Sequence, residues 1–279
     1  MNPLVTPAWL SEHLHDPGTM VLDATLPPVG VTPPVDTRAR YLAAHIPGAV
    51  FFDIEELSDH STPLPHMLPS PEDFSRSMAA LGVGDQMTIV VYEQEGVFSA
   101  PRAWWMLRTF EAQNVYILDG GLRAWIEAGL PTESGTVSLP PARFRAKLDP
   151  DAVKNFTQIQ QMIADQAQIL DARSAGRFSG AAPEPRSGPS SGHMPGAVSV
   201  PFTELAEEGR LKPAQKLREI FAAKGVNLEK PVTTTCGSGV TAAVIALGLE
   251  IAGADNVSLY DGSWAEYAQR PEAVIEKSA

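Results

Sequence analysis

Cysteine is the residue type that this sequence has least of, because Cys236 is the only one among 279 residues. A single cysteine excludes an intramolecular disulfide and any metal site built from several thiolates. No stretch approaches the ~20 consecutive apolar residues that span a bilayer. The N-terminal residues also lack the basic region and apolar stretch of a signal peptide. We therefore expect a cytoplasmic protein with a reduced thiol and no membrane partner.

Positive charge is also scarce, because 21 lysines and arginines face 33 aspartates and glutamates, for a net charge of −12. An acidic chain is a poor partner for nucleic acid or an anionic membrane, so neither is expected. The spacing of metal ligands is absent from the histidines outside the repeated motifs, which are His13, His15, His60 and His66. The sequence therefore predicts no metal and no other cofactor, and any anionic substrate must be bound by local cations.

Three short motifs occur twice, in the same order, in the two halves of the sequence. The pairs are Val-Leu-Asp-Ala at 21–24 with Ile-Leu-Asp-Ala at 169–172, His-Ile-Pro-Gly-Ala-Val at 45–50 with His-Met-Pro-Gly-Ala-Val at 193–198, and Leu-Asp-Gly-Gly at 118–121 with Tyr-Asp-Gly-Ser at 260–263. The first two pairs are 148 residues apart and the third is 142 residues apart. Repeats at such a long period indicate one duplicated domain and not a solenoid.

Each half alternates short apolar runs with helical stretches, which is the pattern of an α/β domain with a mainly parallel sheet flanked by helices. The expected strands are residues 20–23, 88–92 and 115–118 in the first half, and residues 168–171, 232–235 and 257–260 in the second. Two adjacent prolines at 140–141 indicate a linker. We predict a first domain over residues 1–134, a linker over 135–153 and a second domain over 154–279.

The surroundings of Cys236 predict a reactive thiol. The β-branched residues 231–235 before it read as a strand, and residues 240–251 after it have apolar residues at helical spacing. The thiol then lies on a tight strand-to-helix turn, where Gly237 and Gly239 permit the bend. N–H groups at a helix N-terminus favour negative charge, and the thiolate is the nucleophile. A small buried cysteine without chemistry is the alternative.

The first half supplies an internal control for this turn. At the offset of 142 residues, Gln94 stands opposite Cys236, and residues 96–100 stand opposite 238–242. The first half thus keeps the strand and the helix but has no nucleophile. We predict that the first domain is catalytically inactive and that any chemistry belongs to the second.

Several motifs together resemble the two-domain rhodanese superfamily over nearly the whole chain. They are Cys-Gly-Ser-Gly-Val-Thr at 236–241, the doubled His-x-Pro-Gly-Ala, Asp-Gly-Ser-Trp at 261–264 and Ser-Ala-Pro-Arg-Ala-Trp-Trp-Met at 99–106. The resemblance implies two tandem rhodanese-like domains. It also implies a ping-pong sulfurtransferase, in which a donor persulfidates the cysteine and the sulfur then passes to cyanide or a thiol such as thioredoxin.

Within the superfamily, the loop is similar to that of the 3-mercaptopyruvate sulfurtransferase group. Rhodaneses that use thiosulfate, a dianion, carry Arg and Lys just after the cysteine, where this chain has the uncharged Gly237 and Ser238. We therefore expect 3-mercaptopyruvate as the sulfur donor and pyruvate as the product. Thiosulfate stays open as an alternative, because Arg177 and Arg186 could still attract it.

The resemblance assigns Arg177 and Arg186 to the donor's carboxylate, which a planar guanidinium can hold with two hydrogen bonds. The loop residues expected to bind the donor are Gly237, Gly239, Val240 and Thr241. In an ungapped overlay, the first half has Val29 and Arg38 opposite the two arginines, so the pair is particular to the second half. The alternative is two surface arginines on a flexible loop.

The resemblance further suggests that Ser238, His45 and Asp36 form a relay that moves a proton. The internal repeat favours another role for His45, because His193 occupies the equivalent position in the second half. A histidine present in both copies is expected to anchor the turn before the next strand. Both roles of His45 stay open from the sequence alone.

Two other classes of protein fit the sequence less well. Cysteine phosphatases also place a thiolate on such a turn, but they need an arginine where this chain has Ala242. A sulfur carrier or binding module without activity is the second alternative. The retention of the cysteine, Ser238 and both arginines in only one half argues against a domain that has lost its activity.

Overall fold

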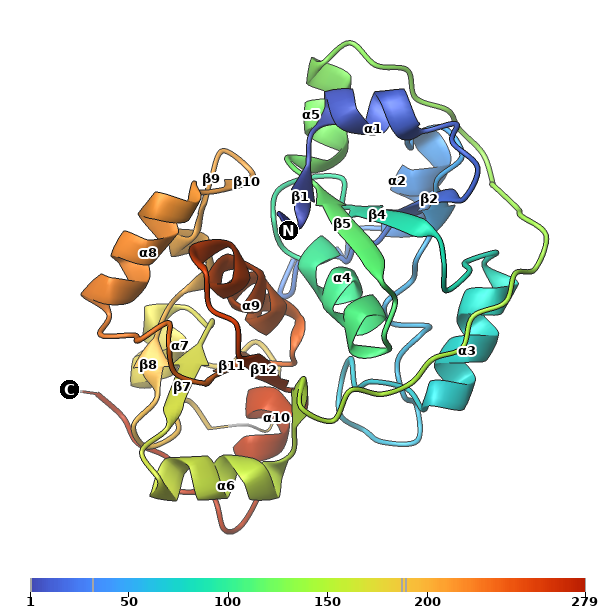
Figure 1. Ribbon diagram of the computed structural model, residues 1–279. Helices are drawn as coiled ribbons and strands as arrows, with labels where there is room; N and C mark the ends of the chain where they lie inside the picture. Colours follow the sequence, from blue (N-terminus) through green and yellow to red (C-terminus); the bar gives the residue numbers. More distant parts are fainter. Residues whose placement is uncertain (1, 32, 187, 189, 279) are drawn as a thin grey trace. The chain divides into compact units, whose positions relative to one another are not determined.

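The computed structural model describes residues 2–31, 33–186, 188 and 190–278. The chain divides into two compact units, each drawn in Figure 1. Unit 1 comprises residues 1–59, 68–149 and 208–210, and unit 2 comprises residues 60–67, 150–207 and 211–279. The short segment 60–67 therefore packs with unit 2, although the chain on both sides of it belongs to unit 1.

Each unit is built on a five-stranded sheet in which the strand pairs are parallel. In unit 1 the order is β1-β5-β4-β2-β3, with β1 Leu4–Val5, β2 Thr19–Asp23, β3 Val50–Phe51, β4 Thr88–Tyr92 and β5 Asn114–Leu118. In unit 2 it is β6-β12-β11-β7-β8, with β6 Val153–Lys154, β7 Gln168–Asp171, β8 Val198–Ser199, β11 Val232–Thr235 and β12 Val257–Tyr260. The two sheets thus share one topology, and the predicted α/β class is confirmed.

The central strands are apolar or β-branched along their whole length, because helices cover both faces of a parallel sheet. In β4, Ile89 to Tyr92 are all buried, and every residue of β11 is buried. The Thr233 hydroxyl of β11 is satisfied by the Ser258 hydroxyl at 2.7 Å. All six predicted strands are present, to within one residue at their ends.

The helices of unit 1 are α1 Pro7–His13, α2 Thr37–Ala43, α3 Pro71–Ala80, α4 Ala100–Thr109 and α5 Gly121–Glu127. Residues of α1 and α5 pack with β2, β4 and β5 in one buried cluster, and α4 contacts β4 and β5. Helix α3 is capped by Ser70, whose hydroxyl accepts the Asp73 N–H, and Pro71 is the first residue of the helix. Such a cap contributes about 1 kcal/mol to the stability of a helix.

The helices of unit 2 are α6 Phe156–Ala164, α7 Ala175–Ser179, α8 Ala214–Ala223, α9 Val240–Ala252 and α10 Ser263–Tyr267, with the 3₁₀ turn η1 Phe202–Glu204. Strands β9 Ala206–Glu207 and β10 Arg210–Leu211 form a two-stranded pair, in which Arg210 is assigned to unit 1. Helices α6 and α10 share a buried cluster with β7 and β12. Helix α9 contacts β11 and β12 and also packs against α8 (Figure 1). No helix of the described residues is long and apolar enough to cross a membrane.

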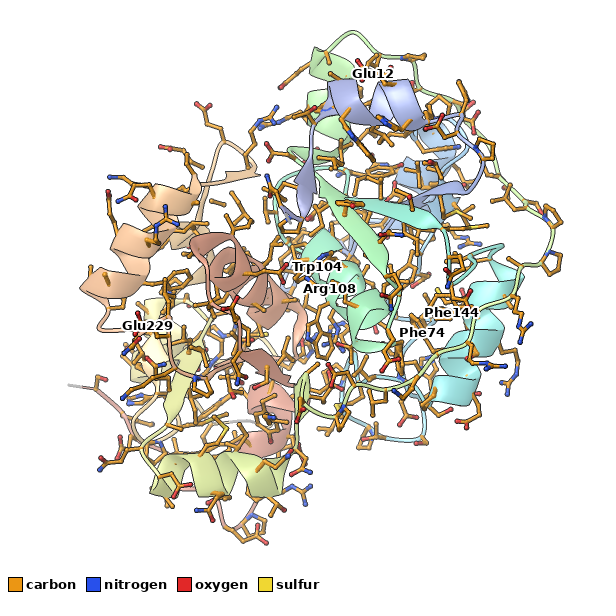
Figure 2. All side chains as sticks on the ribbon, in the orientation of Figure 1. Glu12, Phe74, Trp104, Arg108, Phe144 and Glu229 are labelled. Atoms are coloured by element: carbon orange, nitrogen blue, oxygen red, sulfur yellow. The ribbon has the colours of Figure 1, made fainter. Side chains whose placement is uncertain are left out.

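The predicted linker region contains a segment that packs closely onto unit 1. Phe144 is buried and meets Phe74 of α3 edge-on, with ring centroids 5.7 Å apart (Figure 2). The Ala142 N–H donates to the Ala79 carbonyl at 3.0 Å. The exact domain limits stay a prediction, but residues 142–144 are an integral part of unit 1.

Candidate active site

Cys236 lies between the end of β11 and the start of α9, as the sequence predicted, and is 2% exposed. Its N–H donates to the Ser263 hydroxyl at 3.3 Å, and its carbonyl accepts the Trp264 N–H at 2.9 Å. The Gly237 carbonyl accepts the Ala265 N–H at 2.9 Å. The first turn of α10 therefore fixes the backbone on which the thiol is carried.

Ser263 holds this position in a backbone conformation that is uncommon for a residue with a side chain. Its φ is 47°, in the left-handed region, and its hydroxyl donates to the Tyr260 carbonyl at 2.8 Å. Such strain costs of the order of 1–3 kcal/mol and is concentrated at functional sites. The Ser263 hydroxyl also accepts a hydrogen bond from the Cys236 N–H, which a glycine at position 263 could not do.

The loop after Cys236 leads directly into α9. Gly239 is the N-cap residue of this helix with φ 81°, which favours glycine, and Val240 is its first residue. The first N–H groups of a helix have no partner within it and point toward a negative charge placed at its N-terminus. The predicted donor-binding residues Gly237, Gly239, Val240 and Thr241 thus all lie at this N-terminus, and their roles stay a prediction.

The Ser238 side chain, which is buried, lies between an imidazole and a guanidinium. Its Oγ is 2.9 Å from Nδ1 of His66 and 3.4 Å from Nη1 of Arg186, which donates to it. His66 is itself buried and belongs to the segment of residues 60–67 that packs with unit 2. This hydroxyl can exchange a proton with His66 while the arginine holds positive charge beside it.

Arg177 reaches the same loop from α7. A Cβ atom built on Gly237 would be 2.8 Å from Nη2 of Arg177, which is too close for a real contact. Glycine at 237 therefore lets the guanidinium approach the backbone next to the thiol. The structure brings both predicted arginines to the loop, Arg177 at Gly237 and Arg186 at Ser238.

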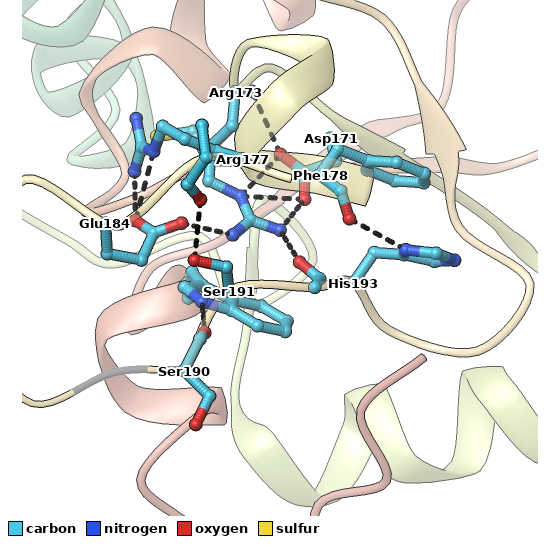
Figure 3. A network of polar contacts seen from close by, with 12 residues as sticks. Asp171, Arg173, Arg177, Phe178, Glu184, Ser190, Ser191 and His193 are labelled. Carbon is cyan, nitrogen blue, oxygen red and sulfur yellow. Dashed lines mark hydrogen bonds and ion pairs between the residues drawn. The ribbon is translucent and has the colours of Figure 1, made fainter. Parts of the chain in front are cut away.

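A network of ion pairs holds Arg177 in place (Figure 3). The Glu184 carboxylate pairs with Arg177 Nη2 at 2.5 Å and with Arg173 Nη1 at 2.8 Å. Arg173 pairs in turn with Asp171 at 2.6 Å and lies over the Trp264 ring, 4.0 Å from its centroid. The network ties the end of β7 to the loop that carries Arg186.

His45 and Asp36 form polar contacts with residues of unit 1. Nδ1 of His45 contacts the Tyr41 carbonyl at 2.8 Å, and its Nε2 contacts Glu133 at 3.1 Å. Asp36 caps α2, where its carboxylate accepts the Ala39 N–H at 2.8 Å. The contacts of Ser238 therefore favour His66 in place of His45 in the suggested relay, and both predicted partners have structural contacts that explain their presence.

The twin histidine makes the same set of contacts in unit 2. Nδ1 of His193 contacts the Phe178 carbonyl at 2.9 Å, and its Nε2 is 3.9 Å from Glu276. The ring stacks on Phe178 at 4.0 Å, as His45 stacks on Tyr41 at 4.3 Å. Each histidine anchors the chain ahead of the next strand, which agrees with the structural interpretation of the repeat.

His66 has no metal-ligand spacing, so the sequence patterns described above do not single it out. A different signal was present in the sequence. His45 has a twin at 193, but the positions 142 and 148 residues after His66 hold Glu208 and Ala214. A histidine present in only one copy of a duplicated domain does not have the anchoring role that His45 and His193 share.

The equivalent loop of unit 1 is filled by its own side chains. The Glu93 carboxylate is buried and accepts the N–H groups of Phe98, Ser99 and Ala100, at 2.7 to 3.2 Å. Burial raises the pKa of Glu93 to about 7, against the lowering effect of these hydrogen bonds. Gln94, which replaces the cysteine, donates from Nε2 to Asp23 at 2.9 Å.

The ungapped overlay of the two halves is wrong in the segment that carries the arginines. The carbonyls that receive the histidine rings belong to Tyr41 and Phe178, so these two residues are equivalent. Arg40, and not Val29, then corresponds to Arg177. Arg40 pairs with Glu95 at 3.6 Å, and Glu95 stands at the offset of 142 residues from Gly237.

Comparison with known proteins places the chain in a family. The rhodanese-like domain family matches residues 6–128 and again residues 155–270. The chain belongs to this family. Because the family matches twice, the two tandem rhodanese-like domains suggested by the sequence are confirmed.

The chain is similar over nearly its whole length to enzymes of this family. The 3-mercaptopyruvate sulfurtransferase of Escherichia coli (strain K12) is 48% identical over 269 residues, covering 96% of this chain and 95% of that protein. The Homo sapiens 3-mercaptopyruvate sulfurtransferase is 44% identical over 286 residues, covering 98% and 95%. The crystal structure of SseA from Escherichia coli has a TM-score of 0.88 at 47% identity, covering 95% of this chain and 100% of that one.

No group of three or more His, Cys, Asp or Glu side chains within residues 2–31, 33–186, 188 and 190–278 is arranged to hold a metal ion. The groups that meet at the loop are the Cys236 thiol, the Ser238 hydroxyl, the His66 imidazole and the guanidinium groups of Arg177 and Arg186.

Proposed function

We propose that this rhodanese-like chain is a sulfurtransferase that moves sulfur from 3-mercaptopyruvate, through a persulfide on Cys236, to a thiol or to cyanide. The observation that carries the proposal is the Ser238 hydroxyl, held between His66 and Arg186 two residues after the lone cysteine. The similarity to 3-mercaptopyruvate sulfurtransferases over nearly the full length supports it.

The charges of the site favour a donor whose negative charge is remote from its reacting sulfur. The loop positions beside the thiol, Gly237 and Ser238, carry no charge. The cations come from Arg177 and Arg186, which meet the loop at those two residues. We propose that they bind the carboxylate of 3-mercaptopyruvate through charge-assisted hydrogen bonds.

In the first half-reaction, the Cys236 thiolate attacks the sulfur of the donor. A sulfur–sulfur bond forms, and the bond between that sulfur and the donor's carbon breaks. The electron pair stays on the carbon as the pyruvate enolate, which takes up a proton to give pyruvate. The proton released by the donor's thiol balances this uptake, and Ser238 with His66 relays it. N–H groups at the start of α9 stabilise the persulfide anion.

In the second half-reaction, an acceptor thiolate attacks the outer sulfur, and Cys236 leaves as a thiolate ready for another cycle. A small protein dithiol such as thioredoxin is the acceptor that we propose. The cytoplasm is the proposed location, because a reducing compartment keeps both the acceptor and the single cysteine in the thiol form.

The test compares initial rates of thiocyanate formation from cyanide with 3-mercaptopyruvate and with thiosulfate as donors. Wild-type protein is expected to prefer 3-mercaptopyruvate strongly, and Cys236→Ser is expected to lose the activity with both donors. A preference for thiosulfate would contradict the assigned donor. Absence of activity with either donor would favour a carrier or binding module instead.

A further inference from the structure

Glu184 is a buried carboxylate placed between two arginines. Its side chain is 5% exposed, and each of its oxygens meets a different guanidinium. One oxygen contacts Nη1 of Arg173 at 2.8 Å, and the other contacts Nε and Nη2 of Arg177 at 3.1 and 2.5 Å. Figure 3 shows the carboxylate between the two arginines. Burial of a carboxylate requires such pairing.

The contact with Arg177 fixes the direction of that side chain. A guanidinium held through Nε and Nη2 by one oxygen is restrained in position and rotation. Its Nη2 is then the atom that lies against Gly237, next to the thiol. Arg177 remains 24% exposed, so its free edge can still bind a carboxylate.

The opposite side of Glu184 is anchored by Arg173, which is a rigid support. The Arg173 side chain is fully buried, pairs with Asp171 of β7 and donates to the Gly192 carbonyl at 2.7 Å. Its guanidinium also lies over the Trp264 ring. Arg173 is therefore fixed relative to β7. Because Arg173 holds one oxygen of Glu184, the other oxygen holds Arg177 in a fixed position.

Glu184 also limits the net charge of the cluster. Three arginines (Arg173, Arg177 and Arg186) and two carboxylates (Asp171 and Glu184) leave one net positive charge. One positive charge matches a donor with a single carboxylate. A dianion such as thiosulfate would gain more from a second positive charge than a monoanion would, because the interaction scales with the product of the charges.

We propose that Glu184 is a positioning and specificity-determining residue, which orients Arg177 toward the donor's carboxylate and keeps the pocket selective for singly charged donors. This inference rests on the proposed function. The role has two parts, which are the orientation of Arg177 and the net charge of the pocket.

Two variants separate these parts. Glu184→Asp keeps the charge but is one methylene too short to hold both arginines. It is expected to raise KM for 3-mercaptopyruvate by about tenfold, with kcat for this donor and kcat/KM for thiosulfate unchanged. Glu184→Gln removes the charge, and it is expected to raise kcat/KM for thiosulfate by about tenfold.

Glu229→Gln is the matched control, because it removes one negative charge from an exposed position of the same unit. It is expected to leave both kinetic constants unchanged. An unchanged KM in Glu184→Asp would overturn the positioning role, even if Glu184→Gln did not fold. An unchanged kcat/KM for thiosulfate in folded Glu184→Gln would overturn the charge role. Failure of the proposed function would differ from both, since wild-type protein would then not prefer 3-mercaptopyruvate.

Discussion

The strand-to-helix loops of the two units have the same fold, but only the loop of unit 1 places a carboxylate of its own at the N-terminus of the following helix. In unit 1 the N–H groups at the start of α4 are taken by the Glu93 carboxylate. In unit 2 the position equivalent to Glu93 is Thr235, whose hydroxyl donates to Ser263 at 3.4 Å. Position 235 therefore supplies no carboxylate to the N–H groups at the start of α9. These N–H groups can instead donate to a thiolate or persulfide on Cys236.

The arginines show the same contrast. Arg40 of unit 1 is paired with Glu95, which belongs to the loop itself. Arg177 of unit 2 meets Gly237, which has no side chain, and takes its carboxylate partner from outside the loop, at Glu184. In unit 1 the carboxylate partner of the arginine belongs to the loop, whereas in unit 2 it lies outside the loop. We therefore propose that the inactivity predicted for unit 1 involves more than the loss of one cysteine.

The largest expected effect concerns the nucleophile. Cys236→Ser is expected to lower the rate of sulfur transfer by about a thousandfold or more, because the weaker nucleophile cannot form a persulfide. Gln94→Cys is expected to create no active second site in that background, since Glu93 and Glu95 remain. Thiocyanate formation by the double variant is the measurement. Recovery of activity would show that the cysteine alone distinguishes the two units.

The next effect separates the two histidines. His66→Asn is expected to lower kcat by about a hundredfold, which is typical for the loss of a group that transfers protons. His45→Asn breaks the anchor to Tyr41 and Glu133, so it is expected to lower Tm and to leave kcat unchanged. Steady-state kinetics and thermal unfolding of both variants provide the check. The reverse pattern would restore His45 to the relay.

The two equivalent arginines should differ in their effect on donor binding. Arg177→Ala is expected to raise KM for 3-mercaptopyruvate by the equivalent of about 1–3 kcal/mol, the value of a charge-assisted hydrogen bond. Arg40→Ala removes an exposed ion pair of unit 1 and is expected to leave the kinetics unchanged. Equal KM values in both variants would contradict the assignment of Arg177 to the donor.

The smallest effect is on stability and concerns Glu93. Its pKa is raised by burial from 4.5 to about 7 in the folded protein, so the folded state holds this proton to higher pH than the unfolded state. The stability contributed by the protonated group is full below pH 4.5 and is lost as pH rises to about 7. Glu93→Gln should remove this part of the pH dependence. Unfolding of both proteins between pH 5 and pH 8 would measure it, and parallel curves would contradict it.

The fold and the catalytic loop could be predicted because their signals are local in the sequence. Strand β11 and helix α9 follow from β-branched residues and helical spacing, and the doubled motifs reveal two domains of the same kind. The same logic predicted that Gln94 replaces the nucleophile.

The contacts of Ser238 could not be predicted in this way. His66 is 172 residues from Ser238 in the sequence, and it contacts Ser238 because residues 60–67 belong to unit 2. The ion pairs of Glu184 and Glu95 also depend on how α2 and α7 align with their loops, which the ungapped overlay misplaced. Contacts of this kind depend on packing between distant segments and leave no periodic pattern.

The most direct test of the account is to treat the protein with 3-mercaptopyruvate in the absence of an acceptor and to measure the mass of its peptides. The account predicts that the peptide containing Cys236 gains the mass of one sulfur atom while pyruvate is released in equal amount, and that cyanide or a thiol removes the added sulfur. Release of pyruvate without sulfur on Cys236 would contradict the persulfide mechanism.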